Sequence, residues 1–129
     1  MPREVWQDWM EQAEHDLEVA RGNRDNGWHD TSVVQSQQAA EKAVKALWMR
    51  CHKRLPQRTH AVNQVAREVD APSEVVAAGT RLARAYFASR YPGMGPAPPF
   101  RSISADEADG RLRDAEEIMA WVKQRLEDK

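Results

Sequence analysis

The chain has 129 residues, a formal net charge of −1 and one cysteine. This length fits a single domain, here residues 1–129, that buries a core without disulfides, and the lone Cys51 excludes an internal disulfide. A lone cysteine favours a reducing compartment. Because no apolar signal region and no stretch of membrane-spanning length is present, we expect a cytoplasmic protein without a membrane segment.

Helical periodicity runs along the whole chain, and no alternating β pattern interrupts it. The predicted helices cover about residues 4–24, 30–52, 60–69, 73–90 and 104–127, with glycine- or proline-containing breakers between most of them. Thr59 is the expected N-cap of the third helix, and Ser104 with Glu107 forms a capping-box pattern. Four prolines and two glycines in residues 92–99 predict a loop without regular structure up to Ile103. The prediction is an all-α, up-and-down bundle of four main helices plus one short helix.

The charges are unevenly distributed along the chain. Residues 42–67 hold seven bases and no acid, whereas residues 1–41 hold nine acids and three bases. A surface of one sign attracts an anion such as RNA or a nucleotide, or an acidic protein. The alternative is that acidic and basic helices pair within the bundle or across a dimer.

The second predicted helix contains the run Gln37-Gln38-Ala39-Ala40-Glu41-Lys42, made of good helix formers. Its alanines have little side-chain bulk, which lets another helix approach closely. The run is followed by Thr59-His60 and then by Ser89-Arg90-Tyr91-Pro92. This order and approximate spacing resemble the HEPN domain family of small helical bacterial and archaeal proteins. The resemblance covers about residues 9–126.

The resemblance implies a nucleotide- or RNA-binding module. It also implies pairing with a minimal nucleotidyltransferase, in a toxin–antitoxin pair or as the substrate-binding half of a two-part enzyme. In such a site Arg90 would hold a phosphate and Tyr91 would stack on a base, beside His60. Lys53 and Arg58 would add positive charge. The alternatives are that His60 packs locally at a helix end and that Tyr91 only terminates a helix.

Arg54 and His60 are separated by five residues, the spacing at which ribonucleases of this family carry an arginine and a histidine. Histidine can exchange protons with a ribose 2′-hydroxyl, and arginine can stabilise charge on the phosphate, so no metal is required. The pair departs from the family's pattern because Pro56 lies inside it and because it comes early in the domain. A metal-independent ribonuclease that uses Arg54, or Arg90, with His60 is therefore the second hypothesis. A helical scaffold without a ligand is the third.

The expected partners also include a second copy of the chain. The resemblance and the small-residue helix face place Ala39, Ala43 and Ala46 at a homodimer interface, and Trp28, in a turn, is the tryptophan most suited to an interface. No spacing among the histidines and Cys51 indicates a metal site, and no glycine-rich phosphate loop is present, so no cofactor is expected. Nothing indicates DNA specificity.

Overall fold

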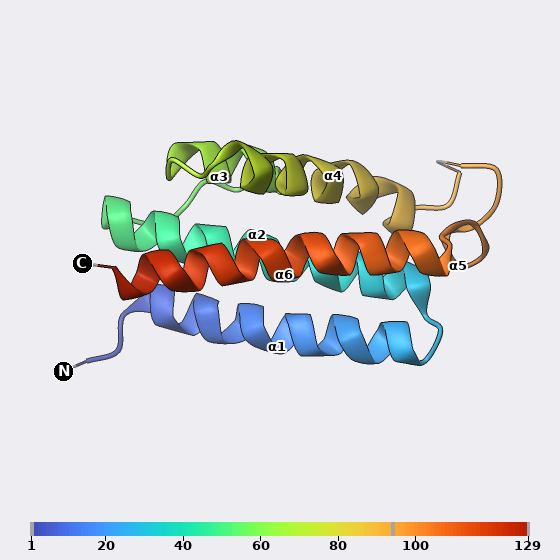
Figure 1. The fold of residues 1–129 in the computed structure, drawn as a ribbon, viewed down its shortest axis with the longest axis horizontal. Coiled ribbons are helices and arrows are strands. Elements are labelled where there is room, and N and C mark those ends of the chain that lie inside the picture. The colour runs from blue at the N-terminus through green and yellow to red at the C-terminus, as the bar shows by residue number, and fades with distance from the viewer. Residues whose placement is uncertain (1, 94, 129) are drawn as a thin grey trace.

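The computed structural model describes residues 2–93 and 95–128, and within them it contains six helices and no strand. The helices are α1 (Val5–Asp25), α2 (His29–His52), α3 (Val62–Glu68), α4 (Ser73–Arg90), α5 (Pro99–Ser102) and α6 (Ala105–Glu127). Consecutive long helices run in opposite directions, with both ends of the chain at the same end of the bundle (Figure 1). The all-α, up-and-down prediction is confirmed.

The four long helices form three layers (Figure 1). α2 and α6 lie together in the middle, α1 covers them on one side, and α4 with α3 covers them on the other. α2 is the central element because it contacts every other helix. More than half of the residues of α2 are therefore buried.

The largest apolar cluster joins α1, α2 and α6 with the inner faces of α3 and α4. Alanines are frequent in it, and Ala13, Ala43 and Ala115 are fully buried, one on each of three helices. Small side chains at such positions let helix axes come close together. The sequence therefore permits tight packing around α2 without large side chains on every helix.

α3 lies close against α4 because Gly79 has no side chain. A Cβ atom at position 79 would lie 2.9 Å from the backbone nitrogen of Asn63, which is too close for any non-bonded contact. The short segment that leads into α3, including His60, therefore lies against α4 near Tyr86. This close approach positions the site described below.

Three local predictions were wrong. α3 begins at Val62 rather than His60, and Thr59 is not its N-cap: its hydroxyl accepts a hydrogen bond from the backbone nitrogen of Ala61 at 3.1 Å. The proline-rich loop contains the four-residue helix α5, because prolines fit at the first position of a helical turn. Ser104 does cap α6, as predicted, by accepting from the Glu107 nitrogen at 3.0 Å.

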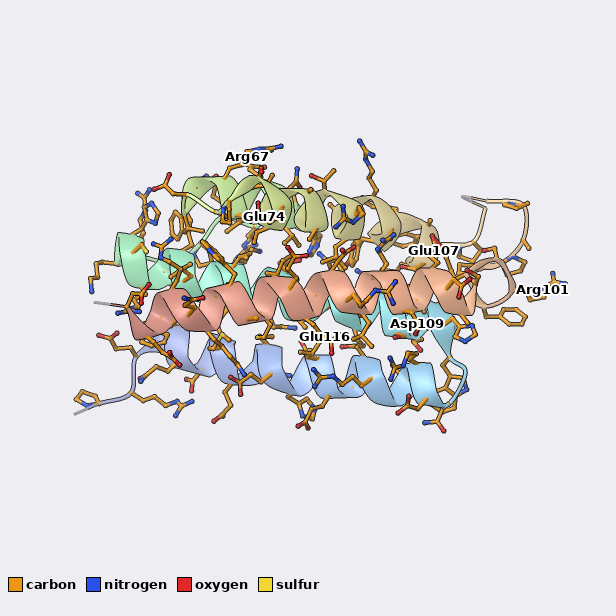
Figure 2. The ribbon with its side chains drawn as sticks, viewed as in Figure 1. Arg67, Glu74, Arg101, Glu107, Asp109 and Glu116 are labelled. Carbon is orange, nitrogen blue, oxygen red and sulfur yellow. The ribbon has the colours of Figure 1, made fainter. Side chains whose placement is uncertain are left out.

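Ion pairs tie α6 to α1 along the outer seam of the bundle. Asp109 and Glu116 project from α6 toward α1 (Figure 2), where they meet Arg24 at 3.7 Å and Arg21 at 2.9 Å. Part of the charge asymmetry is thus resolved by pairing between helices.

Among the described residues, no helix combines the length and the apolar composition that a membrane crossing requires.

Candidate functional site

One face of α2 carries a cluster of buried polar side chains that contact one another. Gln37, Glu41 and Lys45 follow one another at intervals of four residues, which places them on the same side of the helix. All three are buried. The Glu41 carboxylate accepts from Gln37 Nε2 and from Lys45 Nζ, each at 2.9 Å. Burial of these charges is tolerated because they are paired with each other.

His60 is attached to this cluster at two points. Its ring nitrogen Nδ1 lies 2.8 Å from Oε1 of Glu41, and its backbone carbonyl accepts from Gln37 Nε2 at 3.0 Å. A carboxylate accepts only, so Nδ1 is the nitrogen that donates. The orientation of the ring is therefore fixed from the protein side, and Nε2 is left for solvent or a ligand.

The electrostatics of Glu41 favour the ionised form. Burial alone raises the pKa of this carboxyl, but hydrogen bonds from His60, Lys45 and Gln37 together outweigh burial. The pKa of Glu41 therefore lies below its ordinary value of 4.5. In its ionised form, the Glu41 carboxylate accepts the hydrogen bond from Nδ1 of His60.

An aromatic platform lies under the other side of His60. The His60 ring is tilted by 31° over Tyr86 of α4, with ring centroids 5.0 Å apart. The guanidinium carbon of Arg90, one turn later, lies 5.2 Å from the same Tyr86 ring and 5.5 Å from Tyr91. Phe87 and Tyr91 stack at 5.9 Å, and both are exposed. His60 and Arg90 are thus gathered around one buried tyrosine.

A cavity of about 370 Å³ opens at this point. The segment before α3 lines it with Arg58 and His60, and α4 lines it with Tyr86 and Phe87. Among the described residues, no carboxylate lies within 4 Å of Arg58 or of Arg90. The cavity therefore combines the unpaired Arg58, a fixed imidazole and an aromatic wall, with Arg90 nearby on the same Tyr86 ring. This combination suits a phosphate attached to a base.

The predicted site residues divide between two places. His60 and Arg90 lie against the Tyr86 ring, Tyr91 lies beside Arg90, and Arg58 lines the cavity with His60. Arg54 does not, because its guanidinium lies 5.4 Å from the ring centroid of Trp48. Trp48 follows Glu41, the partner of His60, by two helical turns, or about 10 Å along α2.

Lys53 also lies away from the cavity. It ends α2 in a left-handed conformation, with φ of 60°, and lines a different hollow together with Arg54. The structure thus places Arg54 and Lys53 at a different hollow from His60, and their roles beside His60 stay predictions.

The alanines expected at a homodimer interface are also placed differently. Ala39, Ala43 and Ala46 have no exposed surface and belong to the main apolar cluster inside the single chain. These small side chains let helices pack closely within the bundle. Because they are fully buried in the single chain, they cannot contact a second chain. Trp28, in contrast, is 60% exposed at the α1–α2 turn.

Sequence reasoning missed Gln37, Glu41, Lys45 and Tyr86 as site residues. The signal for the first three was present: polar side chains recur at i, i+4 and i+8 in a helix whose other positions are mainly apolar. Tyr86 lies one turn before Arg90, on the buried face of α4.

Within the described residues, no group of three histidine, cysteine, aspartate or glutamate side chains is arranged to hold a metal ion.

Comparisons with known proteins give a consistent result. A family model described as HEPN domain matches residues 6–125. A structure from Thermus thermophilus is similar with a TM-score of 0.85 and 32% identity, covering 92% of this chain and 96% of that one. An archaeal HEPN homologue gives a TM-score of 0.82, 31% identity and coverage of 97% and 100%.

An HEPN domain protein from Thermotoga maritima gives a TM-score of 0.75 and 27% identity, with coverage of 95% of this chain and 99% of that one. No curated protein matches the chain.

Proposed function

The chain belongs to the HEPN domain family, and from this premise we propose that it binds a nucleotide or an RNA phosphate in the cavity beside His60. The observation that carries the proposal is the convergence of His60 and Arg90 on the Tyr86 ring. Arg90 supplies a planar cation for phosphate oxygens, and Nε2 of His60 supplies a fixed polar contact. The exposed Phe87–Tyr91 pair supplies a surface on which a base can stack.

This proposal is tested by a binding titration with AMP and with a labelled single-stranded RNA. Arg90→Ala should weaken binding about tenfold, the effect of losing one charge-assisted contact of about 1.4 kcal/mol. Arg67→Ala is the matched control, because Arg67 is an exposed arginine on α3 that does not line the cavity. Equal affinities for the two variants would remove Arg90 from the site, and no binding of either ligand would favour a scaffold without a ligand.

The second candidate is metal-independent RNA cleavage, and it is favoured by the Glu41–His60 contact. With its proton held on Nδ1, His60 can take the proton of a ribose 2′-hydroxyl on Nε2. The 2′-oxygen then attacks the adjacent phosphorus, the bond from phosphorus to the 5′-oxygen breaks, and that oxygen takes up a proton from water, which leaves a 2′,3′-cyclic phosphate and a 5′-hydroxyl. In this proposal Arg90 would stabilise the phosphate, because its guanidinium lies over the same Tyr86 ring as His60, whereas that of Arg54 lies over Trp48.

Cleavage is tested by incubating the protein with an RNA pool in EDTA beside a His60→Ala variant. Cleavage that disappears in the variant would establish the enzyme and place His60 in it. Absence of cleavage, or cleavage that survives the substitution, would leave binding as the function of the site.

The proposed macromolecular partner is a minimal nucleotidyltransferase, as the family resemblance implies, in a toxin–antitoxin-like or two-component system. A homodimer also stays a proposal, now supported by Trp28 rather than by the alanines of α2. Light scattering of the protein and of a Trp28→Ala variant tests it. A dimer that dissociates in the variant would support the proposal, and a monomer at all concentrations would end it.

A further inference from the structure

A second cavity, of about 290 Å³, lies where α1 begins and α2 ends, at the end of the bundle that holds both termini (Figure 1). Its apolar walls come from Val5, Trp6, Met49 and Leu55. Val5 is 53% exposed and Leu55 is 70% exposed, although both are large aliphatic residues. Exposed apolar side chains gathered around a hollow and rimmed by polar groups are characteristic of binding surfaces.

The rim of this cavity carries three cations, Arg50, Lys53 and Arg54. Arg50 is held in place because its Nη1 donates to the carbonyl of Leu126 at 2.6 Å, and its guanidinium lies 5.7 Å from the Trp6 ring centroid. Arg54 is held over Trp48. Two of the three charges are thus oriented by the protein before any ligand arrives, which reduces the entropy lost on binding.

These charges lack acidic partners in the described part of the chain. No carboxylate described there lies within 4 Å of any of the three cations. Glu4 is the acidic residue that lines the cavity, but its carboxylate accepts a hydrogen bond from Trp6 Nε1 and takes part in the capping box of α1. The site therefore has an apolar floor and a rim with excess positive charge.

We propose that this cavity is a second ligand site, for a small amphipathic anion with a flat apolar body and one carboxylate. The apolar body would lie against Trp6, Met49 and Leu55, and the carboxylate would face Lys53 and Arg54. The volume is at the lower end of the range for small-molecule sites, which limits the ligand to a small one. Charge complementarity selects an anion over a neutral molecule of the same shape.

The site is separate from the cavity beside His60. The two cavities share no lining residue. On α2, Trp48 and Glu41 are seven residues apart, or about 10 Å. The Arg54 guanidinium lies over the ring of Trp48, and His60 is hydrogen-bonded to Glu41. Binding here is therefore expected to be independent of any nucleotide, and His60→Ala should leave it unchanged.

The test is calorimetric titration of the full chain with indole-3-acetate and with its neutral isostere indole-3-acetamide. The acid should bind with a Kd below about 1 mM and the amide about fivefold more weakly, as expected for one partly exposed charge pair. Leu55→Asp should reduce affinity for the acid about tenfold, by removing apolar contact and adding a like charge. Arg54→Gln should reduce it about threefold.

Two matched controls lie at the far end of the bundle, where Arg101 covers exposed Phe100 much as Arg54 covers Trp48. Phe100→Asp and Arg101→Gln should leave the affinity unchanged. Both positions are exposed, as is Leu55, so the variants are expected to fold. Absence of binding, equal binding of acid and amide, or equal effects of Leu55→Asp and Phe100→Asp would overturn the proposal. Binding of acidic peptides without binding of the acid would also overturn it.

Discussion

The two sides of α2 solve the same packing problem in different ways. On one side, Ala39, Ala43 and Ala46 are fully buried in the main apolar cluster, where stability comes from buried apolar area. On the other side, Glu41 and Lys45 are buried as an ion pair that also holds His60. An ion pair of this kind is rarely the most stabilising choice for a buried position, since apolar residues often do as well. Its presence therefore points to a requirement other than stability, which is the fixed orientation of His60.

The largest expected effect comes from breaking the ion pair. Lys45→Met keeps the length of the side chain but leaves the buried Glu41 without its cation, and it should lower the free energy of unfolding by about 3 kcal/mol. Urea denaturation measures this loss. Lys123→Met is the matched control, because Lys123 pairs with Glu14 in an exposed bridge that should contribute less than about 1 kcal/mol. Similar losses in the free energy of unfolding for the two variants would show that the buried pair stabilises the fold no more than an exposed one.

The second prediction concerns the alanine side. Ala43→Leu places a large side chain where no exposed surface exists, and it should lower the free energy of unfolding by about 1–3 kcal/mol. Ala77→Leu, at an exposed position of α4, should have little effect. If Ala43 instead faced a second chain, its replacement would change the oligomeric state by light scattering and leave the stability of the monomer intact.

The contrast between the two sides also explains what the sequence could predict. Helical periodicity depends on local residue spacing, so α4 was predicted with both ends correct and the other long helices within a residue or two. The alanine stripe was recognised as a close-packing face, but the sequence could not say whether the neighbour was α1 or a second chain.

The polar side was harder because its chemistry depends on contacts between distant segments. Glu41 meets His60 across 19 residues, and His60 meets Tyr86 across 26. Spacing suggested Arg54 as the partner of His60, but the aromatic ring of Trp48 holds Arg54 elsewhere. Arg90 was grouped with His60 through the family resemblance, because spacing contains no information on distant contacts. Both side chains lie against the Tyr86 ring, and a shared ligand site stays a proposal.

A smaller effect should appear in the pH dependence of stability. The pKa of Glu41 is lower in the folded chain than its ordinary value of 4.5, so its ionised form contributes stability above that value. This contribution is lost as the pH falls through the lower, folded-state value. Glu41→Gln should therefore lose more stability relative to wild type at pH 7 than at about pH 3, measured by urea titration. The same stability difference at pH 7 and at about pH 3 for Glu41→Gln would contradict the assignment.

The smallest expected effect is that of Tyr86→Phe, and it separates the ring from the hydroxyl. Tyr86 is 2% exposed, and its hydroxyl has no hydrogen-bond partner among the described residues. Removing an unpaired buried hydroxyl should change the free energy of unfolding by less than about 1 kcal/mol, toward higher stability. Because the phenyl ring still supports His60 and Arg90, affinity for AMP should also stay unchanged. Tyr86→Leu removes the ring face and should weaken AMP binding. A loss of affinity in Tyr86→Phe equal to that in Tyr86→Leu would mean that the hydroxyl, and not the aromatic platform, organises the site.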